Sequence, residues 1–509
     1  MITEFLWELF HRLQTLTWPT VILTVITGFV AWFVYQIVQE KLSPLRKIPS
    51  PPGRLPFFGH LFSLWKHGGL HMGLREWEGR YGPIIAFGPG FGRRSERVVI
   101  YDKDLIRQVM ISESHKYRRP EIVKDIIPGV GNGLFASSGK VHAKQRKMIN
   151  PAFSLTNLKT FVPAFVESAE ELVELWTRKI QNSSTVDVGD DICHLTLDII
   201  GKTSFGYGFN TVLGKETEVS TAFNTLLNGA EFGYVVRSRM IPFYRYLPFS
   251  DNLAIKKSIS LVNSTVFKVI NERRMLREQG KAADHKDLLN LLLEMYDEET
   301  GAGFDDEELR AQVFTFMLAG HETTSTSLSW TLYELAKNPE IQDKIRQEIK
   351  GVLKEGEELT WTKLDQLEYL GCMIKESLRL HGPASFVGRE TNQTVHIGGY
   401  EIPKNTFVTV PIDALHLSPD LWENPLDFIP ERFMKTNASP MNQYPFLPFS
   451  FGPRICIGYK FAMAEMKTIV LTLMKNFKLT AVPGFKVKSF MKLTTKPDPS
   501  VKVQISLLH

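Results

Sequence analysis

A single cysteine lies between two glycines at the start of a helical pattern near the end of the chain. Cys456 precedes the apolar stretch Tyr459–Phe477, with Gly452 before it and Gly458 after it. A thiolate at a helix start meets backbone N–H groups and the positive end of the helix dipole, which favour the anion. Glycine lets the backbone turn tightly and approach a flat ligand closely. One thiolate without partner ligands fits axial ligation of haem iron better than zinc, which takes about four ligands.

Two further side chains of this loop stand at fixed spacings from the cysteine. Arg454 adds a guanidinium suited to a carboxylate, and Phe449 begins the loop. Together these residues form Phe-x-x-Gly-x-Arg-x-Cys-x-Gly, and the stretch resembles the cysteine loop of the cytochrome P450 haem-thiolate monooxygenases at every fixed position. An inert buried cysteine in a glycine-rich turn is the alternative for this stretch taken alone.

A long helical pattern in the middle of the chain carries the second group of candidates. It begins after Asp305, a helix-capping residue, and ends before Pro339. Its centre reads Ala-Gly-His-Glu-Thr-Thr over residues 319–324, where hydroxyls compete for backbone carbonyls and loosen the helix. A polar kink in a structural helix is one interpretation. The resemblance implies another, an oxygen-binding groove in which Thr323 donates a hydrogen bond to dioxygen and Glu322 feeds protons toward it.

Basic residues elsewhere would bind the haem propionates if the resemblance holds. His142 and Arg146 are four apart and share one face of a helix. Relatives usually place Trp and Arg there; an imidazole N–H can donate the same bond, with a pH sensitivity that Trp lacks. A solvated basic helix face is the alternative. Arg389 stands where relatives place another propionate-binding arginine, and Ala319 stands where one subgroup of fatty-acid hydroxylases has a Glu that bonds to haem, so non-covalent haem b is implied.

A third group is expected to be structural. Glu376 and Arg379 are three apart in an apolar helical pattern, and Arg432 lies in Pro-Glu-Arg-Phe before the cysteine loop. Alone, such a helical pair is usually a surface ion pair that contributes a few tenths of a kcal/mol. The resemblance joins the three residues into one buried Glu-Arg-Arg network that supports the cysteine loop and takes no part in catalysis.

The N-terminal segment has the composition of a membrane anchor. Residues 13–39 contain no Asp, Glu, Lys or Arg, and 18–38 supply the roughly 20 apolar residues that a spanning helix needs. A cleaved signal peptide is disfavoured because the apolar run is long and no clear small-x-small site follows it. Four basic residues within 41–54 place the downstream chain in the cytosol by the positive-inside rule.

The remaining composition bounds the organisation of the chain. Three scattered cysteines in 509 residues imply no disulfide framework, and a net charge of +5 on so long a chain does not argue for nucleic acid. We expect a membrane anchor over residues 1–40, a basic and proline-rich linker over 41–58, and a haem-thiolate catalytic domain over 59–509. The resemblance implies a mainly α fold with small β-sheets, in which haem lies between the long central helix and the cysteine loop.

The resemblance also implies an activity and its partners. One oxygen atom from O2 would be inserted into a lipophilic substrate, with the catalytic domain on the cytosolic face of the endoplasmic reticulum membrane behind a single-pass anchor. No dinucleotide or flavin motif is evident, so NADPH-cytochrome P450 reductase would supply electrons. The reductase would dock on a basic surface, whose candidate residues are Lys140, Lys144, Lys147, Lys460 and Lys467. The alternative is that these lysines are ordinary solvated charges without a partner protein.

The substrate class is open at this stage. Gly-x-x-His-x-x-Gln-Arg with Asn-Pro-Ala-Phe over residues 139–153 is most similar to fungal microsomal members, many of which oxidise terpenoids or other secondary metabolites. A fatty-acid or sterol hydroxylase is the alternative. A haem-thiolate isomerase or dehydratase, or a haem-binding protein without turnover, are alternatives of another class, which the intact Glu322–Thr323 pair disfavours.

Overall fold

The computed structural model describes residues 18–56, 58–90, 96–214, 218–228, 234, 237–238, 244–280, 287–436 and 446–508. The chain divides into two compact units, one of residues 1–105 and 390–409 and the other of residues 106–389 and 410–509. Helices predominate and the strands are short, which agrees with a mainly α fold with small β-sheets. The first 17 residues of the expected anchor lie outside the described part.

The first unit combines an N-terminal helix with a small sheet. Its elements are α2 (Trp18–Lys41), α3 (Leu61–Lys66), α4 (Leu70–Trp77), β1 (Ile84–Phe87), β2 (Arg97–Ile100), β6 (Val395–Ile397), β7 (Tyr400–Ile402) and β8 (Phe407–Val410). Strand β2 pairs antiparallel with β1 and parallel with β8, and β6 and β7 form an antiparallel pair. The chain passes between the two units through α5 (Lys103–Arg107) and β5 (Val387–Thr391).

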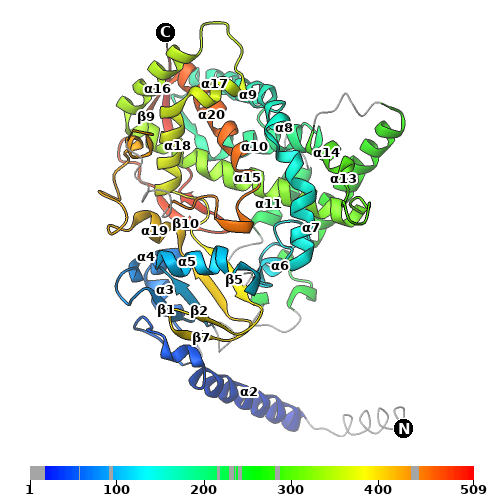
Figure 1. Cartoon of the computed structure of the whole chain (residues 1–509), viewed down its shortest axis with the longest axis vertical. Coiled ribbons are helices and arrows are strands. Elements are labelled where there is room, and N and C mark those ends of the chain that lie inside the picture. The colour runs from blue at the N-terminus through cyan, green and yellow to red at the C-terminus, as the bar shows by residue number, and fades with distance from the viewer. Residues whose placement is uncertain are drawn as a thin grey trace. The chain divides into compact units, whose positions relative to one another are not determined.

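Helix α2 is the candidate membrane span (Figure 1). Its stretch Ile22–Lys41 is long and apolar enough to cross a bilayer, with a mean hydropathy of 1.7. At its end the buried Glu40 accepts a hydrogen bond from Arg54 Nε at 2.9 Å, and Arg54 also contacts the buried Glu96. These ion pairs fix the end of α2 to the segment that follows it.

The second unit is a helical body with two small sheets. Its helices are α6 (Ile122–Ile126), α7 (Gly139–Ile149), α8 (Leu155–Lys159), α9 (Val162–Ile180), α10 (Val188–Phe205), α11 (Glu218–Asn228), α13 (Ser250–Glu278), α14 (Leu288–Glu294), α15 (Asp306–Lys337), α16 (Pro339–Val352), α17 (Trp361–Gln366), α18 (Glu368–Leu380), α19 (Ile412–Leu417) and α20 (Tyr459–Asn476). Its strands are β3 (Tyr117–Arg118), β4 (Thr185–Asp187), β9 (Phe477–Ala481), β10 (Lys488–Met491), β11 (Thr495–Asp498) and β12 (Lys502–Leu507). The sheets are β4-β12-β9 and the pair β10-β11.

Helix α15 runs through the core of this unit (Figure 1). The expected cap is present, because Asp305 accepts from Glu308 N at 2.7 Å and the Glu308 carboxylate accepts from Asp305 N. The helix packs against α10, α13, α18 and α20, and its last turns bury Leu328, Leu332 and Leu335 completely. Residues on nearly every side of the helix are buried, so its position is set by packing from all directions.

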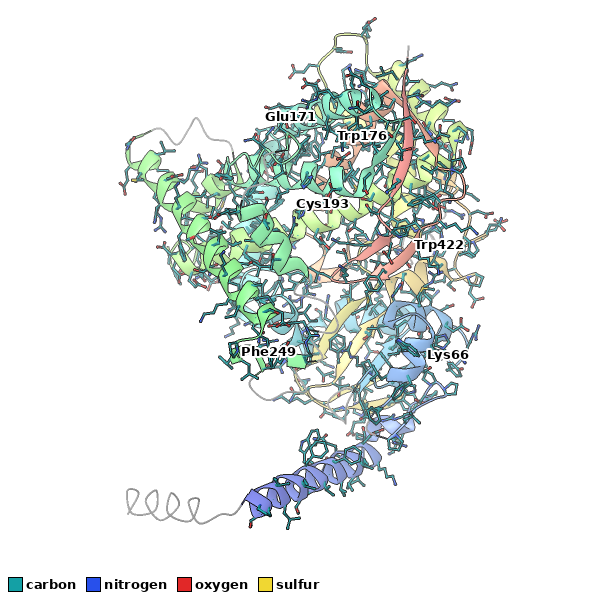
Figure 2. The ribbon with its side chains drawn as sticks, turned by 180° about the vertical axis from the view of Figure 1, so that it is seen from behind. Lys66, Glu171, Trp176, Cys193, Phe249 and Trp422 are labelled. Atoms are coloured by element: carbon teal, nitrogen blue, oxygen red, sulfur yellow. The ribbon has the colours of Figure 1, made fainter. Side chains whose placement is uncertain are left out.

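Polar contacts also join the helices that surround α15. Trp176 of α9, labelled in Figure 2, donates its indole N–H to Asp191 of α10 at 2.8 Å. Trp176 is fully buried, so this bond satisfies a donor that would otherwise be lost inside the core. Helix α10, which packs against α15, is thereby joined to α9.

Candidate active site

Cys456 lies in the short loop between the 3-10 turn Gly452–Arg454 and helix α20. Its backbone N–H donates to Phe449 O at 2.9 Å, which closes the loop upon itself. The Cys456 side chain is exposed, whereas Cys372 is buried. An exposed cysteine residue at a helix start is placed to bind a ligand, whereas a cysteine buried in the core is not.

The two glycines of the loop have different roles. Gly452 has φ +73°, and a Cβ there would lie 2.2 Å from Met110 O, so both its conformation and its contact require glycine. The expected close approach is therefore made to the chain at Met110. Gly458 has φ −89°, and a Cβ there would meet only Phe153 at 3.8 Å, an ordinary contact. Nothing in the described protein contacts explains the glycine at 458.

The pKa of the Cys456 thiol is shifted in the direction opposite to the one expected from the sequence, which was toward the thiolate. Although the residue is exposed, desolvation by the surrounding protein raises the pKa of Cys456, while a hydrogen bond from Gly458 N and the charge of Arg146 lower it. The net direction is upward, so the helix start alone does not make the thiolate. A coordinated metal ion would make it, because a ligating thiol is deprotonated outright.

A cluster of basic side chains has no acidic partner among the residues that the structure describes. Desolvation, followed by the charges of neighbouring arginines, lowers the pKa of Arg119 to about 9, of Arg389 to about 10 and of His142 to about 4. Desolvation lowers the pKa of Arg454 to about 10. Cations that disfavour one another's charge inside a protein form a site for an anion, and the two propionates of haem have the required charge. The donor set therefore fits haem.

Arg119 was not identified from the sequence. It follows another arginine in a Gly- and Pro-rich stretch, and neither its type nor its spacing distinguishes it. In the structure its Nε donates to Phe135 O at 3.0 Å, its guanidinium lies 4.0 Å from the Phe135 ring centroid, and its backbone N–H donates to Ser138 Oγ. Arg454 donates to Ser137 O at 2.8 Å. The same short segment thus orients both guanidinium groups.

Arg146 and His142 both lie on α7 but make different contacts. Arg146 Nη1 donates to Ile455 O at 2.7 Å, directly beside Cys456, so this side chain braces the cysteine loop. His142 is buried, and desolvation together with the charges of neighbouring arginines lowers the pKa of its imidazole to about 4. A bound propionate would raise this pKa again, so the pH sensitivity expected at this position stays a prediction.

The centre of α15 is open on one side. Between Leu309 and Leu332, Ala319, Gly320 and Thr323 are the residues that are not buried. Thr323 Oγ1 donates to Ala319 O at 2.6 Å, which is the competition for a helix carbonyl that the sequence predicts. A Cβ on Gly320 would lie 2.5 Å from the Ile200 side chain, so glycine also allows α10 to pack closely here.

Glu322, the other candidate on α15, faces a different element. It is 2% exposed, and its Oε1 accepts a hydrogen bond from Thr494 Oγ1 at 2.8 Å. Its Oε2 lies 2.9 Å from Lys496 Nζ. The carboxylate is therefore held against the start of β11, while the Thr323 hydroxyl is turned to its own helix.

The Glu-Arg-Arg residues are in direct contact. Arg379 donates to both carboxylate oxygens of Glu376, at 2.8 and 2.7 Å, and Arg432 Nε donates to Oε1 at 3.0 Å. Glu376 and Arg379 are fully buried. Arg379 Nη1 also donates to His416 O at 2.8 Å, and His416 Nε2 accepts from Leu447 N at 2.8 Å. A buried histidine that the sequence did not single out thus links the network to the start of the cysteine loop.

Known proteins are similar to this chain over most of its length. A family model described as Cytochrome P450 matches residues 49–505. Cytochrome P450 4A6 of Oryctolagus cuniculus is 33% identical over 421 residues, which are 81% of each chain. Leukotriene-B4 omega-hydroxylase 3 of Mus musculus is 32% identical over 489 residues, 91% of this chain and 90% of that protein. Taurochenodeoxycholic 6 alpha-hydroxylase of Sus scrofa is 31% identical over 456 residues, 88% of each.

Proposed function

The chain belongs to the cytochrome P450 family, which makes it a haem-thiolate monooxygenase for a lipophilic substrate, and from this we propose that it hydroxylates a lipid acid of the fatty-acid type. The observation that carries the proposal is the similarity, over about nine-tenths of both chains, to a protein named as a leukotriene-B4 omega-hydroxylase. A second relative is named for hydroxylation of a bile-acid conjugate, which is also a lipophilic acid. The comparisons do not support the terpenoid substrates expected from the fungal resemblance.

Different residues of the second unit would bind the iron and the propionates of the cofactor. Cys456 would be the iron's protein ligand, and Arg119, His142, Arg389 and Arg454 would hold the propionates through the anion site described above. Haem held in this way supplies the insertion of one oxygen atom of O2 into a C–H bond.

The open centre of α15 would take part in the same reaction from the helix side. Thr323 is half-buried there with its hydroxyl donating to Ala319 O, and we assign this hydroxyl to a hydrogen bond with the oxygen substrate. Glu322 is the buried acid next to it, and we assign it to proton supply. Proton transfer by a positioned side chain contributes about 10²–10⁴-fold in rate. An isomerase or dehydratase, which consumes no O2, would not need this pair.

The substrate class can be tested by binding and by turnover. The purified protein is titrated with lauric acid, leukotriene B4, taurochenodeoxycholate, a sterol and a terpene hydrocarbon, and occupancy is followed by the haem absorption spectrum. We expect the acids to bind, and NADPH use to depend on both O2 and a bound acid. Binding of the terpene with none of the acids would refute the proposed substrate class, and NADPH-independent conversion without O2 would favour an isomerase.

Part of the basic surface is available for a reductase. Lys140 and Lys460 are exposed and Lys144 is half-buried, whereas Lys467 donates to Leu364 O and Leu367 O at 2.7 and 2.9 Å and so serves the structure. Lys147 pairs with Glu298 at 2.7 Å. We therefore propose that NADPH-cytochrome P450 reductase docks over Lys140, Lys144 and Lys460, with opposite charges speeding the encounter.

The docking proposal has a direct test. Lys140→Glu should slow reductase-driven turnover and flatten its dependence on salt, because exposed charges are screened over about 10 Å at roughly 0.1 M salt. Turnover driven by added hydrogen peroxide should be unaffected. Lys350→Glu on α16, also an exposed lysine, is the control. Equal losses on both routes would mean that the substitution damages haem binding, and the docking site would be withdrawn.

The same proposal includes the placement in the cell. We propose that residues 1–40 anchor the protein in the endoplasmic reticulum membrane, that 41–58 link the anchor to the body, and that 59–509 form a cytosolic catalytic domain. Helix α2 and the basic residues that follow it support this placement.

A further inference from the structure

The segment of residues 129–138 carries the two backbone carbonyls to which Arg119 and Arg454 donate. We propose that Gln145 of α7 and Gln312 of α15 are positioning residues for haem binding, because they hold this segment in the shape that presents both carbonyls to the arginines. The inference rests on the propionate site of the proposed function and extends it to two side chains that need not touch the cofactor.

The segment has little internal structure of its own. Residues 129–138 belong to no helix or strand, and lie between the end of α6 and the start of α7. Within it, Ala136 N and Ser137 N both donate to Gly133 O, at 3.0 and 2.9 Å. Ordering such a stretch costs conformational entropy, and its buried backbone groups still need partners. The rest of its shape therefore depends on bonds from other elements.

Gln145 joins two points of the segment. Its Nε2 donates to Asn132 O at 3.0 Å, and its Oε1 accepts from Ser137 Oγ at 2.8 Å. Gln145 and Ser137 are each 1% exposed, so water does not replace these bonds easily. The Ser137 carbonyl accepts from Arg454 Nη2 at 2.8 Å. Gln145 thus acts on the Arg454 guanidinium through one intervening residue.

Helix α15 holds the same segment from another side. Leu134 N donates to Gln312 Oε1 at 2.9 Å, and Arg310 Nη1 donates to Gly129 O at 3.0 Å. Gln312 is fully buried and Arg310 nearly so. A Cβ on Gly133 would clash with a backbone carbonyl of α15, so this glycine lets the segment lie directly on the helix. Side chains of two helices therefore fix the segment at several points along its length.

The fixed segment gives the arginines a defined direction. Arg119 Nε donates to Phe135 O at 3.0 Å, and Arg454 makes the corresponding bond to the next carbonyl but one. A guanidinium has five N–H donors, so one such bond leaves others for a carboxylate. Side chains that are already oriented lose less freedom when they bind an anion. A loosened segment would leave both guanidinium groups without fixed acceptors, and the propionates would be bound less firmly.

The test measures how long the haem protein retains its haem. Transfer of haem to excess apomyoglobin is followed by absorbance, well below the denaturation midpoint. Gln145→Met keeps the length of the side chain but loses both bonds, and it should release haem about tenfold faster because buried partners are left unsatisfied. Gln312→Met should also release haem faster. Gln312→Glu keeps an acceptor for Leu134 N and should behave as the wild type.

Gln342 of α16 provides a matched control. It is fully buried, donates to Leu335 O and Leu479 O, and accepts from Leu479 N, so it is bonded as extensively as Gln145 but not to the segment. Gln342→Met should lower the denaturation midpoint and leave the rate of haem loss below it unchanged. Equal rates in Gln342→Met and Gln145→Met would overturn the inference. If Gln145→Met does not fold, equal rates in Gln312→Met and Gln312→Glu would do so.

A spectrum and a double variant show whether Gln145 acts through the propionate site. The propionate bending band in the resonance Raman spectrum should shift in Gln145→Met and not in Gln342→Met. In an Arg454→Met background, Gln145→Met should accelerate haem loss less than it does in the wild type, because the two residues share one contact. An unshifted band or fully additive effects would overturn the inference. Failure of the propionate site itself is distinguishable, because Arg454→Met and Arg119→Met alone would then leave haem loss unchanged, and the inference would be withdrawn with it.

Discussion

Removal of Glu376 should destabilise the protein strongly, although this residue lies outside the cysteine loop. In Glu376→Ala, Arg379 loses two hydrogen bonds to carboxylate oxygens and Arg432 loses one, and Ile429 N loses its acceptor at 3.0 Å. Arg379 has no exposed side-chain surface, so its charge would stay buried with backbone carbonyls and the Trp422 ring around it and no carboxylate contact to replace Glu376. Breaking a buried ion pair by removing one partner costs about 3–5 kcal/mol.

This cost can be converted into a thermal shift. At about 2.1 cal/mol/K per residue, the roughly 450 residues of the P450 region have an unfolding entropy near 1 kcal/mol/K. The expected loss is therefore roughly 3–5 °C in the midpoint of thermal denaturation. We would follow the carbon-monoxide difference band of the reduced haem protein at a fixed heating rate, because a chain of this size need not unfold in two states.

A matched control tests whether burial is the cause. Glu431 precedes Arg432 and also pairs with a cation, Lys344 at 2.6 Å, but its side chain is 38% exposed. Glu431→Ala should cost less than about 1 kcal/mol and shift the midpoint by about 1 °C. Glu376→Gln, which keeps acceptor and donor groups but no charge, should fall between the two. Equal shifts for Glu376→Ala and Glu431→Ala would refute the reasoning.

Three further outcomes follow from the site. Cys456→Ser should abolish the red-shifted carbon-monoxide band of the reduced protein, whereas Cys372→Ser, a buried thiol, should retain it; the opposite pattern would reassign the iron ligand. Thr323→Ala should still bind substrate and oxidise NADPH but release hydrogen peroxide in place of product, and an unchanged product yield per NADPH would remove the residue from proton supply. Burial lowers the pKa of His416 to about 3, below the unfolded value of about 6.5, so the stability that its neutral form contributes is complete above pH 6.5 and is lost as the pH falls toward 3. His416→Asn should reduce the slope of the unfolding free energy against pH between pH 4 and 6.5 by up to about 1.4 kcal/mol per pH unit, and an unchanged acid limb of the stability curve would contradict this.

The parts of the fold that could be predicted depend on local signals. The bounds of α15 follow from a capping residue and a proline, both of which act on their immediate neighbours. The contact of Glu376 with Arg379 follows from helical spacing, since residues three apart share a face. Whether that pair lies on the surface or in the core is not a local property. The buried environment comes from α19 and the segment before the cysteine loop, which reach Arg379 from elsewhere in the chain.

The residues that the sequence missed share a physical reason. Arg119 and His416 gain their importance from groups that are distant along the chain: Arg389 and Arg454 for the first, Leu447 for the second. Neither residue has a spacing that distinguishes it from a surface side chain. The orientation of Glu322 could not be derived either, because its partner Lys496 lies far along the chain on another element. Sequence periodicity locates an acid on a helix, but only tertiary packing decides what it faces.

The cysteine loop and the groove of α15 differ in how firmly they are held. Three contacts support the loop and the residues that lead into it: Arg146 on Ile455 O, Met110 against Gly452, and His416 on Leu447 N. Each support involves the backbone of the loop, so it fixes the path of the chain and not only a side chain. The centre of α15 is instead open, and its hydroxyl groups take helix carbonyls as acceptors. Members of the family share the cysteine loop but act on different substrates. A firmly held cysteine loop next to a less closely packed groove is consistent with this. Substitutions in the supports should therefore be detected first as loss of the thiolate spectrum, and substitutions in the groove first as loss of coupling.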